Sequence, residues 1–276
     1  MIRSLLRRQT LASFDYQWRE LPEGGGLLSD EWFNDNAVRI ISEELLCVRA
    51  DWFRGKRILD AGCGSGRWTV GLLRLGADVV ATDVSEHALG YARENVATLC
   101  STAEAARFHA VRANLLDLPA ELRTERFDCV FSFGVLHHTG DTRRALANVA
   151  RLVGGEDGVV FLYLYGRESV GTLARLALAS QRYALAPLPF AVKRRVVAAL
   201  RRGADVHQSF DLLSPTINDR YTFVEVAGWL HDLGFDDVAR TADHSELFIR
   251  ALRRTDTLAE DRLPPPERPY WFERYG

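Results

Sequence analysis

The stretch RILDAGCGSGRWT, residues 57–69, constrains the fold more than any other part of the chain. A short apolar run leads into an acid, Asp60, and glycines then occupy three alternate positions, Gly62, Gly64 and Gly66. Glycines at this spacing after a strand indicate that something approaches the backbone too closely for side chains. We therefore expect a strand that ends in a ligand-binding loop.

The rest of the chain surrounds this loop with alternating strands and helices. The expected strands are residues 57–59, 77–85, 108–115, 127–135 and 158–165, and the clearest helices are 69–75 and 86–99. Continuous apolar strands separated by helices are typical of a parallel sheet covered on both faces. Ser85 is the expected N-cap of the second helix.

The end of the sheet is expected to run differently. An amphipathic helix over 224–235 is stopped by Gly234, and strands at 236–243 and 246–254 follow. Only the dipeptide HS joins these two strands, which is too short for a crossover. The last two strands should therefore be antiparallel.

Two segments do not fit the alternation, and they divide the chain into five expected parts. These are an aromatic-rich helical lid (1–53), the core (54–166), a helical cap (167–212), the end of the core sheet (213–253) and an irregular tail (254–276). The cap carries a basic stripe, Lys193, Arg194, Arg195, Arg201 and Arg202. A solvated face, a dimer contact, an acidic acceptor and a membrane surface all stay open as interpretations of that stripe.

The residues of the glycine loop favour one ligand class. A dinucleotide loop needs G-x-G-x-x-G/A, and counted from Gly62 its third small residue would be Arg67, a poor occupant. Asp60 beside the loop is unfavourable for a pyrophosphate. The carboxylate suits a ligand with a positive charge, such as an amino group or a sulfonium.

With these residues in place, the sequence resembles the class I AdoMet-dependent methyltransferases of the small-molecule (UbiE/UbiG-like) type. LDAGCGSG is similar to the first motif of that family, and the segments 113–119 and 127–138 are similar to its adenine-contacting loop and its substrate-facing strand and loop. The resemblance implies a Rossmann-like seven-stranded sheet with its last strand antiparallel. It also implies S-adenosyl-L-methionine (AdoMet) as cofactor.

Residue by residue, the resemblance implies a cofactor site. Asp83 would hold both ribose hydroxyls, and Asn114 stands where the family usually has aspartate. Asp60 is left open between a bond to the loop backbone and a contact with the cofactor, and Cys63 is interpreted as filler. Tyr16 and Trp18 of the aromatic lid are candidates for the methionine end or the sulfonium. The full expected set is Asp60, Gly62, Cys63, Gly64, Gly66, Asp83, Val84, Asn114, Leu115, Phe133, Tyr16 and Trp18.

The adjacent histidines His137 and His138 follow the fourth strand. Without a clear third ligand they do not predict a metal site. A histidine there can take a proton from a hydroxyl or amine nucleophile, with His138 slightly preferred. Packing is the alternative interpretation of the pair.

Composition narrows the function classes. The net charge of −2 gives no pull towards nucleic acid, and four scattered cysteines are expected to be reduced thiols. The basic start lacks the apolar core of a signal peptide, so we expect a cytoplasmic protein without stable membrane insertion. A homodimer stays open.

The sequence thus predicts an AdoMet-dependent methyltransferase (EC 2.1.1.-) acting on an O, N or C nucleophile of a small molecule. A secondary metabolite or sugar-like intermediate is the favoured acceptor. The alternatives are a quinone or lipid methyltransferase that docks on membranes through the basic helix, an RNA or protein methyltransferase, and a non-catalytic AdoMet-binding protein.

Overall fold

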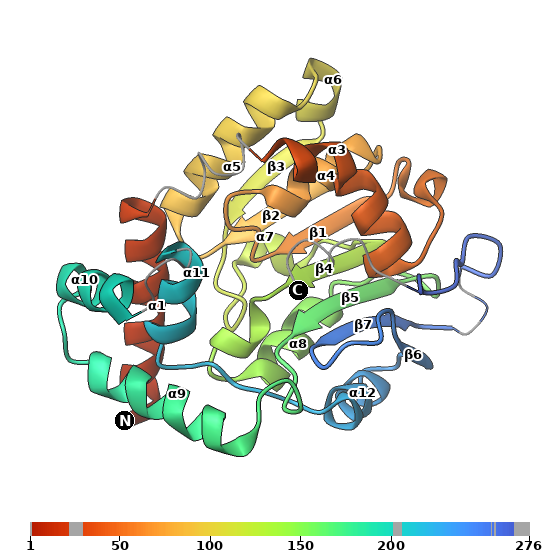
Figure 1. Cartoon of the computed structure of the whole chain (residues 1–276). Helices are drawn as coiled ribbons and strands as arrows, with labels where there is room; N and C mark the ends of the chain where they lie inside the picture. The colour runs from red at the N-terminus through yellow and green to blue at the C-terminus, as the bar shows by residue number, and fades with distance from the viewer. Residues whose placement is uncertain (1, 22–29, 201–205, 255, 257, 268–276) are drawn as a thin grey trace.

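The computed structural model describes residues 2–21, 30–200, 206–254, 256 and 258–267. Its centre is a seven-stranded sheet of order β3-β2-β1-β4-β5-β7-β6 (Figure 1). Strands β1 to β5 pair in parallel, and β7 runs antiparallel to both β5 and β6. This confirms the predicted sheet and its antiparallel last strand. The strands are β1 (Arg57–Ala61), β2 (Asp78–Asp83), β3 (Phe108–Arg112), β4 (Cys129–Phe133), β5 (Val159–Leu164), β6 (Asp237–Arg240) and β7 (Leu247–Leu252).

Helices cover both faces of the sheet because successive side chains of each strand point to opposite faces. Ile58 and Phe131 pack into one apolar layer, whereas Leu59 and Val130 pack into the other. The first layer is closed by α3 (Glu31–Arg39), η1 (Ile40–Leu46), α4 (Arg67–Arg74) and α5 (Glu86–Leu99), and the second by α7 (Ala120–Arg123), α8 (Thr142–Ala150) and α12 (Phe223–Asp232). Three further helices in this part of the molecule are short, η2 (Ala50–Phe53), α6 (Thr102–Ala105) and η3 (Leu136–His138).

The helices of the first two crossovers, α4 and α5, lie where the sequence predicted them. The α4 helix ends at Arg74, just before Gly76, and α5 spans the predicted residues. The predicted N-cap residue is also confirmed, but its capping bond is absent. Ser85 occupies the N-cap position of α5 but makes no side-chain cap, because its hydroxyl donates to Asp15 at 3.0 Å instead.

A second group of helices lies beside the carboxyl ends of the parallel strands, at the left of Figure 1. It consists of α1 (Ile2–Glu20), α9 (Thr172–Leu185), α10 (Phe190–Leu200) and α11 (Val206–Leu213). Hydrogen bonds join α1 to the last of these helices and to the residues after it. Ser13 donates to the Ser214 hydroxyl at 2.6 Å, and Gln17 Nε2 lies 2.6 Å from His207 Nε2.

The basic stripe on α10 is not a continuous surface. Lys193 is fully buried, with Nζ 4.8 Å from the Phe190 ring, whereas Arg194 and Arg195 are exposed. Arg201 and Arg202 lie outside the described residues. The interpretation of the stripe as one solvated basic face is therefore wrong for Lys193. The packing of the helices places its side chain in the interior.

Candidate active site

The glycine loop is fixed to the neighbouring strand. The backbone N–H groups of Gly62 and Cys63 both donate to the Thr82 carbonyl at 2.8 Å. Gly62, Gly64 and Gly66 all have positive φ (88°, 54° and 82°), a conformation that side chains disfavour. The end of β1 and the end of β2 are thereby joined at the sheet edge where ligands bind in open α/β folds.

The nearest neighbours of these glycines are protein atoms, whereas the sequence predicted the approach of a ligand. A Cβ on Gly62 would lie 2.4 Å from the Val135 side chain, and one on Gly64 would lie 2.8 Å from Trp18. At Gly66 the obstacle is the Ala92 Cβ of α5, 3.0 Å away. The loop therefore touches α1, α5 and the segment after β4, and these elements bound the site.

Asp83, at the end of β2, holds the loop in place. Its Oδ2 accepts from the Gly64 N–H at 3.1 Å and its Oδ1 accepts from the Ser85 N–H at 2.9 Å. Burial raises the pKa of Asp83, and the backbone hydrogen bonds oppose that shift. The residue is only half-buried, and a carboxylate has about four acceptor positions, more than the backbone N–H groups of Gly64, Val84 and Ser85 use. The carboxylate therefore fits a pair of ribose hydroxyls.

Asp60 has a partner that neither sequence alternative named. Its side chain is 1% exposed, and its Oδ2 accepts from the Thr69 hydroxyl at 2.6 Å. Burial, with the charge of Asp83 as a smaller cause, raises the pKa of Asp60 to about 7. The residue links β1 to α4 underneath the loop. Cys63 is also buried, and burial raises its pKa well above the ordinary value, which fits filler and not a nucleophile.

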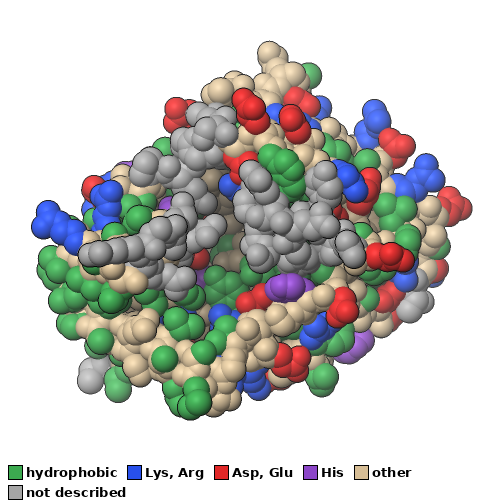
Figure 2. Space-filling view, in the orientation of Figure 1, with side chains coloured by type: hydrophobic (Ala, Val, Ile, Leu, Met, Phe, Trp, Pro, Cys, Tyr) green, Lys and Arg blue, Asp and Glu red, His purple; other side chains and the backbone are tan. Residues whose placement is uncertain are grey.

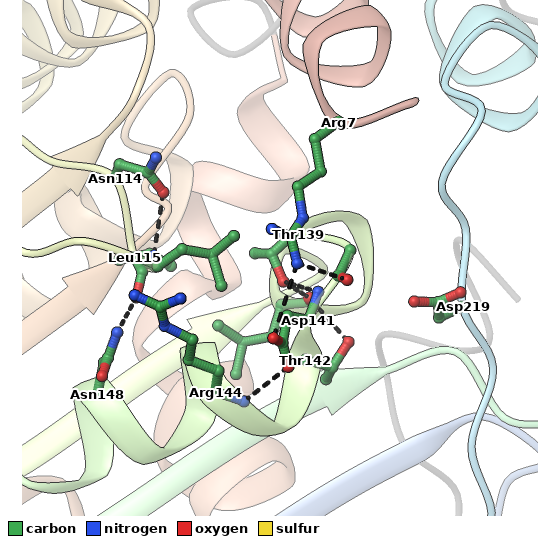
Figure 3. Close-up of polar contacts among 12 residues, drawn as sticks. Arg7, Asn114, Leu115, Thr139, Asp141, Thr142, Arg144, Asn148 and Asp219 are labelled. Carbon is green, nitrogen blue, oxygen red and sulfur yellow. Dashed lines mark hydrogen bonds and ion pairs between the residues drawn. The ribbon is translucent and has the colours of Figure 1, made fainter. Parts of the chain in front are cut away.

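The segment after β3 offers an exposed side-chain amide. Asn114 Oδ1 accepts from the Leu116 N–H at 3.0 Å, which leaves its exposed NH₂ group as the donor for a ligand. The Leu115 carbonyl accepts from Asn148 of α8 at 2.9 Å (Figure 3). Val84, after β2, is half-buried.

The two aromatic candidates of α1 point to different places, since residues two apart on a helix lie on nearly opposite sides. Trp18 covers Gly64. Tyr16 stacks on Phe190 at 5.3 Å and lies 5.7 Å from Phe210, both in the group of cap helices. The expectation that Tyr16 contacts the cofactor is therefore replaced by a packing contact between α1 and the cap.

Phe133 lies at the end of β4 inside an aromatic layer. Its ring centroid is 4.5 Å from that of Trp68 and 4.4 Å from that of Tyr163. It is half-buried, so the layer forms the floor of the site between the glycine loop and β5.

The histidine pair lies in η3, directly after β4. His138 Nδ1 is 2.8 Å from the Ile217 carbonyl, which can only accept, so Nδ1 carries the proton. The lone pair is then on Nε2, which is buried without a hydrogen-bond partner. His137 is fully buried, both its ring nitrogens lack partners, and its ring lies 4.0 Å from that of Tyr165.

Both imidazoles are neutral at pH 7. Burial lowers the pKa of His137 well below its usual value, and the neighbouring His138, Arg220 and Arg182 add to the effect. Burial also lowers the pKa of His138. A neutral imidazole with a free Nε2 is equipped to accept a proton.

Sequence reasoning missed two arginines near this pair. Arg182 of α9 is buried, its Nε donates to the Leu212 carbonyl at 2.8 Å, and its Nη2 has no partner. Arg220 lies over the Tyr165 ring at 4.9 Å and pairs with Glu246 at 3.3 Å. Helical spacing was the available signal, because Arg182 shares a face of α9 with apolar residues three and four positions away.

The loop after η3 is tied to the first helix. Arg7 of α1 donates to the Gly140 carbonyl at 3.0 Å and lies 3.7 Å from Asp141 (Figure 3). Asp141 also caps α8 by accepting from the Arg144 N–H. A displacement of α1 would therefore change its contacts with the loop that follows the histidine pair and with the glycine loop.

Two further properties of the described residues concern metal binding and membrane spanning. Within the described ranges, no cluster of three or more His, Cys, Asp or Glu side chains is arranged to hold a metal ion. Among the helices of the described residues, none has the length and apolar character needed to span a membrane.

Comparison with known proteins was made by sequence and by structure. Residues 58–155 match the family model described as a methyltransferase domain. A ubiquinone biosynthesis O-methyltransferase of Dechloromonas aromatica is 30% identical over 170 residues, 59% of this chain and 69% of the relative. One from Thiobacillus denitrificans is 31% identical over 168 residues, 59% and 68% of the two chains.

Among solved structures, magnesium protoporphyrin IX methyltransferase from Synechocystis PCC 6803, with bound SAM, has a similar fold. The TM-score is 0.52 at 15% identity, over 91% of this chain and 97% of the other.

Proposed function

Because the chain belongs to the class I AdoMet-dependent methyltransferases, we propose that it transfers a methyl group to an O, N or C nucleophile of a small molecule. Its cofactor is AdoMet, which supplies an activated methyl group on a sulfonium. A secondary metabolite or a sugar-like intermediate is the acceptor that we favour. A hydroxyl is the preferred nucleophile, since the curated relatives compared above are named O-methyltransferases.

The observation that carries this proposal is the arrangement of Asp83. Its carboxylate is aligned by two backbone N–H groups and keeps lone pairs for a diol. In the proposal, Asp83 holds the ribose, Val84, Asn114 and Leu115 line the adenine side, and the loop of Gly62, Cys63, Gly64 and Gly66 faces the methionine part. Phe133 forms the floor. Asp60 supports the loop from below through Thr69.

His138 is the proposed general base. As the acceptor oxygen forms its bond to the methyl carbon and the carbon–sulfur bond breaks, the hydroxyl proton passes to Nε2. The Ile217 carbonyl keeps the Nδ1 proton in place and stabilises the resulting imidazolium. General-base catalysis of this kind is worth about 10²–10⁴ in rate. His137 is the alternative base, and its two unpartnered nitrogens support a contact with the acceptor.

Positioning supplies the larger part of the rate enhancement. Holding the acceptor in line with the methyl group can contribute about 7–11 kcal/mol. In the proposal, the cap helices hold the acceptor against the histidine pair, and Trp18 covers the sulfonium. A cation–π contact of that kind adds about 0.5–2 kcal/mol.

The proposal treats the acceptor as a free small molecule and not as part of a nucleic acid, in line with the net charge of −2. A quinone or lipid acceptor is the second candidate, and it is favoured by the similarity to ubiquinone biosynthesis O-methyltransferases. A homodimer is compatible with either. A gel shift of tRNA at physiological salt would argue against a small-molecule acceptor.

The experiment is a methyl-transfer assay with isotope-labelled AdoMet against hydroxylated aromatic, quinol and sugar acceptors. We expect label in one acceptor class with the natural chain and none with Asp83→Ala. Cofactor binding without label in any acceptor would favour the non-catalytic alternative.

A further inference from the structure

Exposed apolar side chains gather on the helices beside the sheet and are scarce elsewhere. Of the nine large hydrophobic side chains that are exposed among the described residues, eight belong to α1, α9 and α10. These eight are Ile2, Leu5, Leu11, Leu173, Leu176, Tyr183, Val192 and Leu200; the ninth is Val224 of α12. Contiguous exposed apolar surface marks a binding surface more often than singly exposed side chains do.

On α9 the exposed residues form a stripe. Leu173 is 83% exposed and Leu176 is 61% exposed, and Tyr183 follows two turns later. The opposite side of the helix carries its buried residues, Arg182 and Leu185, and Leu185 belongs to a core cluster. The outer stripe is therefore additional to the core-facing one, and an ordinary surface helix has no need of it.

The neighbouring helix repeats this arrangement. On α10, Val197 and Lys193 are buried, whereas Val192 and Leu200, which is 63% exposed, face outward. Figure 2 shows hydrophobic side chains gathered over the region that α9 and α10 occupy in Figure 1. We call the exposed side chains of these two helices, Leu173, Leu176, Tyr183, Val192 and Leu200, the α9–α10 face.

The charge around this face has one sign. Residues 169–204 contain no aspartate or glutamate. The exposed cations of the two helices are Arg194 and Arg195, and Arg175 of α9 is half-buried. An apolar surface surrounded by arginines complements a surface with an apolar interior and anionic headgroups.

The positive charge around the α9–α10 face also distinguishes between two partners, a second copy of the chain and an anionic membrane. A second copy of the chain packed face to face about a twofold axis would bring arginines against arginines. An anionic lipid surface neutralises them and accepts the leucines. We propose that the α9–α10 face docks the protein on anionic membranes, as a peripheral contact and not a spanning one. This goes beyond the proposed methyl transfer and does not depend on it.

Docking through these helices has a consequence for the acceptor. Arg182 of α9 is buried on the inner side of the cap and affects both imidazoles of η3, so a docked enzyme would hold its acceptor region close to the lipid. An acceptor dissolved in the membrane would then have a short path to the site.

The test is co-sedimentation of the full chain with vesicles of phosphatidylglycerol and phosphatidylcholine, or of phosphatidylcholine alone. We expect binding to the first and little to the second. The double variant Leu173→Glu/Leu176→Glu should bind at least about tenfold less, because each change removes apolar area and adds repulsion. Val224→Glu, an equally exposed apolar position on α12, is the matched control and should bind like the natural chain.

Calorimetric binding of AdoMet to each variant shows that it is folded and keeps a failure of docking separate from a failure of the proposed function. Absence of binding by the natural chain to anionic vesicles would overturn the proposal, as would an equal loss in Val224→Glu. So would a dimer in analytical ultracentrifugation that the double variant dissociates, because the face would then be occupied by a second copy.

Discussion

The two sides of the candidate site differ in how their polar groups are satisfied. On the cofactor side, defined by residues 60–66, 83–85 and 114–115, no buried side-chain nitrogen or oxygen of the described structure lacks a hydrogen-bond partner. On the acceptor side, His137, His138 and Arg182 together have four such atoms without partners. Unsatisfied buried polar atoms each cost on the order of 1–3 kcal/mol.

This difference shows how each side is prepared for its ligand. The cofactor side is complete by itself, and its ligand adds bonds to groups already aligned by the backbone. The acceptor side keeps unsatisfied atoms, and in the proposal the acceptor molecule supplies their partners. Natural proteins concentrate such costs at functional sites.

The largest effect should come from removing the aligned carboxylate. Asp83→Ala deletes the acceptor of two backbone N–H groups and of the proposed ribose bonds. We expect the Kd of AdoMet to rise at least about 100-fold, since hydrogen bonds to a charged group are worth about 1.5–3 kcal/mol each. Titration calorimetry measures it. Asp117→Ala, at an exposed acid of the nearby loop, should leave the Kd unchanged.

The second effect should appear in the rate alone. His138→Gln removes the proposed base, so kcat should fall by about 10²–10⁴ while the Kd of AdoMet stays the same. His109→Gln, at an exposed histidine of β3, is the control. A fall in cofactor affinity together with the rate would mean that the two sides are not separate.

If His138 is the base, kcat/KM should depend on pH. The pKa of His138 lies below its usual value, so the active, unprotonated form is fully present at pH 7. We expect kcat/KM to be level above pH 6.5 and to decline on acidification. A decline that begins above pH 7 would contradict a buried histidine as base.

A smaller effect tests the packing of the glycine loop. Gly66→Ala puts a Cβ at positive φ and against Ala92, which should destabilise the fold by about 1–3 kcal/mol. Gly90→Ala, in α5 with open space around it, should stabilise the helix by about 0.5–1 kcal/mol. Thermal unfolding of the two variants should shift the Tm in opposite directions.

The smallest effects are opposite pH dependences of stability on the two sides. The pKa of Asp60 is raised to about 7, so the stability it contributes is present at acid pH and is lost as the pH rises towards 7. The pKa of His137 is lowered, so its contribution is present above pH 6.5 and is lost as the pH falls.

Asp60→Asn should accordingly gain most in Tm, relative to the natural chain, at pH 8, and His137→Gln at pH 5. Parallel Tm–pH curves for either variant and the natural chain would rule out that residue as the source.

The two sides also differ in how far the sequence predicted them. The cofactor side is local, because a strand, its loop and the acid at the end of the next strand are each short continuous segments. Hydrophobic runs therefore predicted the parallel sheet, the two-residue link predicted the antiparallel last strand, and the glycine spacing predicted the loop that Asp83 contacts. The partner of Asp60 escaped prediction because Thr69 was considered only as the start of a helix.

The acceptor side is assembled from distant segments, and its details were not predictable in the same way. Arg182, His138 and Ile217 meet only after α9 to α11 have packed on the sheet. The inward turn of Lys193 and the stacking of Tyr16 on Phe190 depend on the same packing. The pattern of a single sequence shows which face of each helix is apolar. It does not show which other helix that face contacts.

A crystal structure with S-adenosylhomocysteine would show whether the cofactor binds at Asp83 and faces the histidine pair. We expect both ribose hydroxyls within hydrogen-bond distance of the Asp83 carboxylate, and the sulfur on the side of the loop that faces His138. A ribose bound away from Asp83, or a sulfur directed away from the histidine pair, would contradict it.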